Sequence, residues 1–72
     1  MIDIDYYKKE KQRLEKELSE AKYRYLTGLE RNDKEAKYVA ARDASKIKAQ
    51  IEQLKKELKE KNNGVLPEWW NQ

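Results

Sequence analysis

Hydroxyl groups and paired glutamates are the side chains in this sequence that could carry chemistry. Ser19, Thr27 and Ser45 could act as nucleophiles only beside a general base that takes up their proton. The 72 residues include no histidine and no cysteine, and the lysines lie in polar stretches that promise no burial. We therefore expect a protein that is not an enzyme.

Two pairs of acidic residues, Glu15 with Glu20 and Glu57 with Glu60, could bind a divalent cation loosely. Spacings of this kind arise by chance in any helix that is rich in glutamate. The two glycines stand alone, so the sequence has no glycine-rich loop to hold a phosphate. We expect no metal, no cofactor and no small-molecule substrate.

Cations and aromatic rings alternate along the first half of the chain, a composition that suits contact with phosphates and unstacked bases. The residues concerned are Lys9, Arg13, Lys16, Lys22, Tyr23 and Arg24. Lys9, Lys16 and Tyr23 recur at seven-residue spacing, which places them on one outer line of a helix. Glu10 and Glu17 lie close by and would repel a phosphate backbone. Nucleic-acid binding, to RNA or DNA, is therefore the alternative function.

The chain ends GVLPEWWNQ, with its two largest apolar side chains next to each other. Trp69, Trp70 and Leu66 follow a polar sequence and flank a proline, which prevents a helix from simply continuing. Two hypotheses fit. The segment could close the open end of the fold, or it could anchor a protein partner, because tryptophan is enriched among interface hot spots.

The composition favours long solvated helices. Charged residues make up 43% of the chain and hydrophobic residues 38%. The chain has 17 basic and 14 acidic residues, which gives a net charge of +3. No apolar run approaches the roughly 18 residues of a membrane span, and the first residues do not resemble a signal peptide. We expect an all-α cytoplasmic protein with no membrane partner.

Heptad spacing predicts an apolar stripe in each half of the chain. The first has Ile4, Lys11, Leu18 and Tyr25 at position a, and Tyr7, Leu14, Ala21 and Gly28 at position d. The second has Lys37, Ala44, Ile51 and Leu58 at a, and Ala40, Ile47, Leu54 and Lys61 at d. The interval from Tyr25 to Lys37 is not a multiple of seven, so one straight helix would present the stripes on different faces.

A reversal of the chain removes this conflict. Antiparallel matching of a with d places the midpoint between Asn32 and Asp33, and it brings Arg24 beside Asp43. The matched pairs are Leu18 with Ile47, Leu14 with Ile51, Tyr7 with Leu58, Ala21 with Ala44, and Tyr25 with Ala40. We predict a hairpin domain at 1–63, with helices at about 4–29 and 34–62, a turn at 30–33, and a tail at 64–72. A dimer of unbroken rods is the structural alternative.

Residues that favour helix ends support the same boundaries. Asp3 is a suitable N-cap for the first helix. Asn32 followed by Glu35 predicts an N-cap with a capping-box partner for the second helix. Gly28 marks either the end of the first helix or a close approach of the two backbones.

Five apolar residues near the turn fall outside both stripes: Tyr23, Leu26, Leu29, Tyr38 and Val39. We expect them to form a second apolar patch, because one seam is small for a domain of this length. The patch could join two hairpins into a four-helix bundle or receive another protein. The predicted function is a small protein-interaction or assembly module that binds a protein partner, itself, or both.

Overall fold

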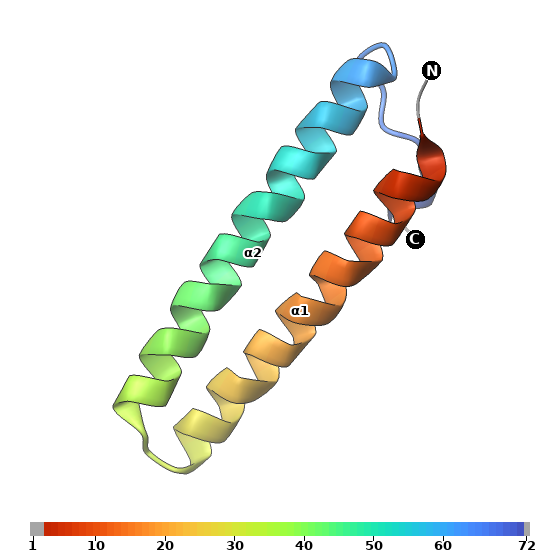
Figure 1. The fold of residues 1–72 in the computed structure, drawn as a ribbon. Helices are drawn as coiled ribbons and strands as arrows, with labels where there is room; N and C mark the ends of the chain where they lie inside the picture. Colours follow the sequence, from red (N-terminus) through yellow and green to blue (C-terminus); the bar gives the residue numbers. More distant parts are fainter. Residues whose placement is uncertain (1–2, 72) are drawn as a thin grey trace.

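Two long helices, joined by a tight turn, lie side by side and run in opposite directions (Figure 1). The computed structural model describes residues 3–71, so the predicted ranges at both ends of the chain extend slightly beyond it. Helix α1 spans Ile4–Glu30 and α2 spans Lys34–Lys61, and a short 3-10 helix, η1, spans Glu68–Asn71. The Cα trace extends 48 Å along its longest axis and 16 Å along each of the other two. The chain thus turns back on itself and does not form a continuous rod.

The turn between the helices is built by two adjacent residues with different roles. Asn32 takes a left-handed conformation, with φ of 57°. The amide of Asp33 then donates to the Gly28 carbonyl at 2.8 Å, and the amide of Asn32 donates to the Leu29 carbonyl at 3.1 Å. These are the two hydrogen bonds of a Schellman motif, which ends α1.

The predicted N-cap at Asn32 is wrong by one residue. Asp33 occupies the N-cap of α2, and its carboxylate accepts a hydrogen bond from the Ala36 amide at 3.1 Å. Asn32 cannot be the N-cap, because it takes the left-handed conformation that ends α1, whereas an N-cap residue has an extended backbone. The extended residue is the next one, Asp33. The N-cap predicted at Asp3 is confirmed, because its carboxylate accepts from the Tyr6 amide at 3.1 Å.

The buried seam between the helices follows the d positions of both stripes. Buried residues of α1 are Tyr7, Leu14, Ala21 and Gly28, and those of α2 are Ala40, Ile47, Leu54 and Leu58. Most a positions are only partly covered, and Ile4 and Tyr25 are exposed. Leu58 is the exception, because it is an a residue with no exposed surface. Lys61, assigned to d, lies in solvent.

Gly28 lies inside α1, where the first turn of α2 packs close against it. A Cβ atom placed on it would lie 3.1 Å from the backbone nitrogen of Lys37 and 3.3 Å from the Cβ of Ala36. The glycine therefore has the second of its two predicted roles. Because the nearest atom belongs to backbone, a larger side chain at this position requires α2 to move.

Gly28→Leu is expected to lower the free energy of unfolding by about 1–3 kcal/mol, the usual cost of overpacking. Leucine has the higher helix propensity, so a loss of stability would come from steric pressure on the first turn of α2. Urea unfolding followed by circular dichroism measures the effect. Glu30→Leu, at an exposed site near the end of the same helix, serves as the control and should leave stability nearly unchanged. Equal behaviour of the two variants would contradict the close approach.

Candidate functional site

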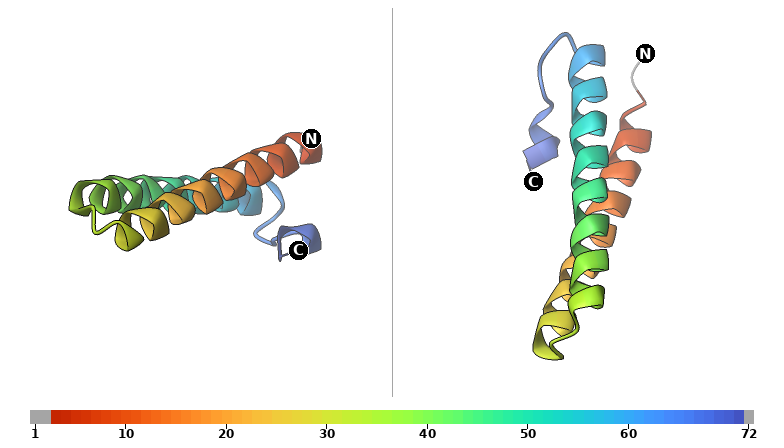
Figure 2. Two further views of the ribbon diagram at one scale, coloured as in Figure 1. Left: turned by 90° about the horizontal axis from the view of Figure 1, so that it is seen from below. Right: turned by 90° about the vertical axis from the view of Figure 1, so that its left-hand side faces the viewer.

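The C-terminal segment turns back along one side of the helical pair, near the end where α1 begins and α2 ends (Figure 2). Its reversal uses left-handed residues, Asn63 at φ 57° and Gly64 at φ 80°. The amide of Gly64 donates to the Lys59 carbonyl at 2.8 Å, and the Asn62 side chain donates to the Val65 carbonyl at 2.8 Å. We call residues 66–71 the Trp segment.

The Trp segment packs against the hydrophobic core. Trp70 is 7% exposed and belongs to the same buried cluster as Tyr7, Leu54 and Leu58. Leu66 and Trp69 are partly buried and pack against that cluster. The indole Nε1 of Trp69 is buried and has no hydrogen-bond partner among residues 3–71. In this arrangement a partner could reach Trp70 only after the segment separates from the helices.

Lysine side chains of α1 lie over both tryptophan rings. The Nζ atom of Lys11 is 5.4 Å from the centroid of Trp70, and that of Lys8 is 5.5 Å from the centroid of Trp69. These distances fall within the range of cation–π attraction, worth about 0.5–1 kcal/mol at exposed sites. We call the side of the hairpin that carries Lys8, Lys11 and the Trp segment the Trp side.

Large apolar side chains are exposed mainly around the turn. Within residues 3–71, six of the nine large apolar residues that stand in solvent fall between positions 23 and 39. They are Tyr23, Tyr25, Leu26, Leu29, Tyr38 and Val39, with exposed fractions from 39% to 71%. All five residues of the predicted patch are therefore at the surface.

Four of these residues line two separate grooves, which lie on opposite sides of the hairpin. The Trp-side groove has a volume of about 480 Å³ and is lined by Lys22, Tyr25, Leu26, Ala40, Ala41, Ala44, Ser45 and Lys48. The opposite groove has a volume of about 520 Å³ and is lined by Tyr23, Arg24, Thr27, Gly28, Arg31, Asp33, Glu35, Ala36, Val39, Ala40 and Asp43. Leu29 and Tyr38 line neither groove.

Heptad spacing identifies which groove lies on the Trp side. Lys8, Glu15 and Lys22 follow one another at seven-residue intervals, so they share one line along α1. Lys8 and Glu15 line the depression beside Trp69, while Lys22 lines the 480 Å³ groove. That groove is therefore the continuation, toward the turn, of the surface that the Trp segment covers.

The cations proposed for nucleic-acid binding are spread around α1, and two of them are paired with acids. Arg13 contacts Glu10 and Glu17 at 2.9 Å each, and Arg24 contacts Asp43 at 3.8 Å, as the antiparallel register predicts. Hydrogen bonding to Arg13 lowers the pKa of Glu10, and the same contact raises the pKa of Arg13. Lys9, Lys16, Lys22 and Tyr23 are exposed.

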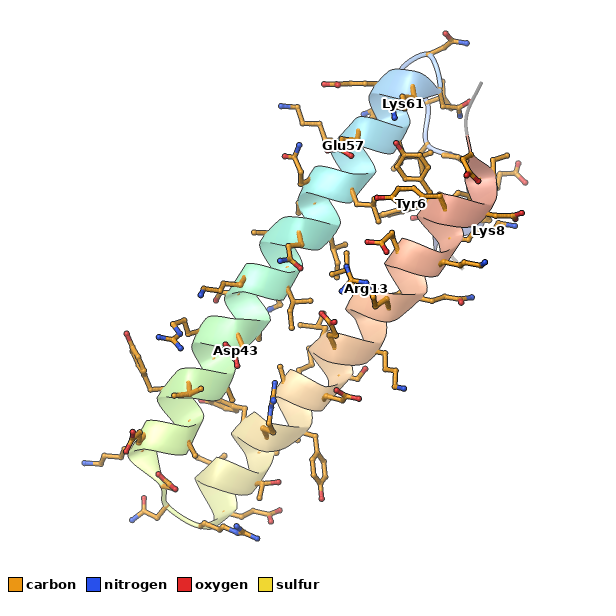
Figure 3. All side chains as sticks on the ribbon, in the orientation of Figure 1. Tyr6, Lys8, Arg13, Asp43, Glu57 and Lys61 are labelled. Carbon is orange, nitrogen blue, oxygen red and sulfur yellow. The ribbon has the colours of Figure 1, made fainter. Side chains whose placement is uncertain are left out.

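The open end of the hairpin is also rich in charge (Figure 3). The figure shows Lys8, Glu57 and Lys61 there, and Asp43 toward the turn. Interaction with the Tyr7 hydroxyl, chiefly by hydrogen bonding, raises the pKa of Lys61.

Within residues 3–71, no group of three or more acidic side chains is arranged to hold a metal ion. In the same part of the chain, neither helix is long and apolar enough to cross a membrane.

The fold and its surfaces define a two-helix antiparallel hairpin with a docked aromatic segment. Comparison with protein-family models, curated proteins and solved structures finds no match to this chain.

Proposed function

We propose that this protein is a docking module that binds another protein, or a second copy of itself, through the exposed apolar residues at the turn end of the hairpin. The observation that carries the proposal is the concentration of exposed Tyr, Leu and Val side chains between positions 23 and 39. Exposed apolar side chains gathered at one end of a molecule commonly mark an interaction site.

The two ends of the hairpin differ in how their apolar side chains are covered, and this difference supports the proposal. At the open end, Trp70 and Leu58 share one buried cluster, so the aromatic segment completes the core there. At the turn end, no comparable segment among residues 3–71 covers Leu26, Leu29 or Tyr38, which are 52–69% exposed. The turn end thus has apolar surface to offer a partner.

Acidic substitutions at the turn end should weaken association without unfolding the hairpin. We expect Leu26→Glu combined with Tyr38→Glu to reduce capture of a protein partner at least tenfold, because both side chains leave an apolar contact and become charged. The measurement is a quantitative pull-down from the native cell, with sedimentation velocity on the purified chain to detect self-association. Circular dichroism checks that the variant stays helical.

Ala49→Glu combined with Lys56→Gln is the matched control, because it changes the net charge equally at exposed positions of α2 away from the turn. Capture that falls to the same extent in both variants would contradict a role for the turn end. Recovery of nucleic acid alone, lost on Lys9→Glu with Lys16→Glu and steeply dependent on salt, would favour the alternative function.

A further inference from the structure

The floor of the Trp-side groove is made of small side chains. Ala40, Ala41 and Ala44 of α2 line it together with Tyr25 and Leu26 of α1. Because alanine does not extend beyond its Cβ, the space between the larger flanking side chains stays open. The result is a largely apolar channel between the two helices, on the side of the hairpin that carries the Trp segment.

The charged residues that line this channel are lysines. Lys22 comes from α1 and Lys48 from α2, so each helix contributes one cation. Neither lysine is in an ion pair within residues 3–71. Glu15, the acid that precedes Lys22 by one heptad, is paired with Lys11 at 2.9 Å. The channel therefore carries positive charge from both helices, with no lining acid to compensate it.

The opposite groove differs in this respect. Its lining includes two arginines and three acids, and one pair of these, Arg24 and Asp43, is already in contact at 3.8 Å. Charges of both signs make that groove a poor discriminator of partner charge. The Trp-side channel, in contrast, disfavours a second copy of itself, because two such surfaces would bring lysines against lysines.

The chain's own C-terminus shows what this side of the hairpin accommodates. Helix η1 has the sequence EWWN, a short helical turn with an acid next to two aromatic rings. It lies against the same side, with Trp70 buried and the ammonium groups of Lys8 and Lys11 over the rings. The same side of the hairpin thus already holds one apolar helical segment, η1, under the ammonium groups of Lys8 and Lys11.

We propose that the Trp-side groove binds an acidic amphipathic helix of a partner protein. The apolar stripe of that helix would lie on Ala41, Ala44 and Leu26, as in other helix-in-groove complexes. Aspartate or glutamate on both edges of the stripe would meet Lys22 and Lys48. This inference rests on the proposed docking function and adds the chemistry of the partner.

Fluorescence anisotropy with synthetic peptides tests the inference on the 72-residue chain. The probe is an 18-residue labelled helix with a leucine stripe flanked by glutamates. A peptide of the same composition with a scrambled order, and one with lysine in place of glutamate, are the comparison probes. We expect the amphipathic acidic peptide to bind at least tenfold more tightly than either, with affinity falling as salt is added.

Lys22→Glu combined with Lys48→Glu is expected to weaken binding of the acidic peptide at least tenfold. Arg42→Glu combined with Lys56→Glu changes the net charge equally at exposed positions of α2, and should keep affinity within twofold. Equal loss in both variants, or equal binding of the scrambled peptide, would overturn the proposal in favour of general charge attraction.

The outcome separates this inference from the proposed function. If native-cell capture depends on Leu26 and Tyr38 while Lys22 and Lys48 have no effect on acidic peptide, the docking function stands and the acidic helix is wrong. If neither capture nor peptide binding responds to any turn-end variant, both proposals fail. Thermal melting of each variant confirms that the hairpin is intact before binding is interpreted.

Discussion

Trp70→Ala is expected to lower the free energy of unfolding by about 3–5 kcal/mol, the range for removing a large buried aromatic side chain. Trp70 is 7% exposed and belongs to the cluster that also contains Tyr7 and Leu58. A two-helix chain of 72 residues has few other buried side chains to compensate the loss. Urea unfolding monitored by circular dichroism should show the midpoint falling sharply. A change below about 1 kcal/mol would mean that the Trp segment does not complete the core.

Trp69→Phe provides a control within the same segment. The indole Nε1 of Trp69 is buried without a hydrogen-bond partner in the described part of the chain. An unsatisfied buried donor costs about 1–3 kcal/mol, and phenylalanine removes that donor while keeping an aromatic ring. The variant is therefore expected to be as stable as the parent chain or more stable, whereas Trp70→Ala is not.

Heptad spacing predicts the seam of this hairpin because burial follows the d positions closely. Tyr7, Leu14 and Ala21 recur at seven-residue intervals, and all three are buried. The antiparallel register follows from the same spacing, and the Arg24 contact with Asp43 confirms it. Spacing alone does not predict that residues at d are more buried than residues at a. This difference depends on the angle at which the helices cross and on which other segments cover the side chains.

Two features of the surfaces escape the sequence patterns for different reasons. The docking side of the Trp segment depends on left-handed residues at Asn63 and Gly64, and a four-residue helix has no periodicity to reveal which face it buries. The separation of Leu26 from Val39 is predictable from the sequence, because their heptad positions, b and c, lie on different flanks of the seam. Tyr23, at position f, points away from the seam, so spacing alone does not predict which groove it lines.

Leu58→Ala is expected to cost about 2–5 kcal/mol of unfolding free energy, because this leucine has no exposed surface. Other apolar a residues, such as Leu18 and Ile51, are only partly buried, and we attribute the difference to cover by Trp70. Because Trp70 covers Leu58, the effects of Leu58→Ala and Trp70→Ala on the free energy of unfolding should not be additive. Leu58→Ala should cost about 1–3 kcal/mol less when Trp70 is already alanine.

The double-mutant cycle is measured by urea unfolding in an osmolyte that favours the compact state, so that the weakest variant still folds. Ile47→Ala is the matched control, because Ile47 precedes Leu58 in α2 by about three turns, roughly 16 Å toward the turn, and lines a depression with Glu17 and Arg24 that does not include the Trp segment. Its cost should be the same with and without Trp70. Additive costs for Leu58 would show that the helices alone bury this side chain, and the Trp segment would then be free to leave the core and meet a partner.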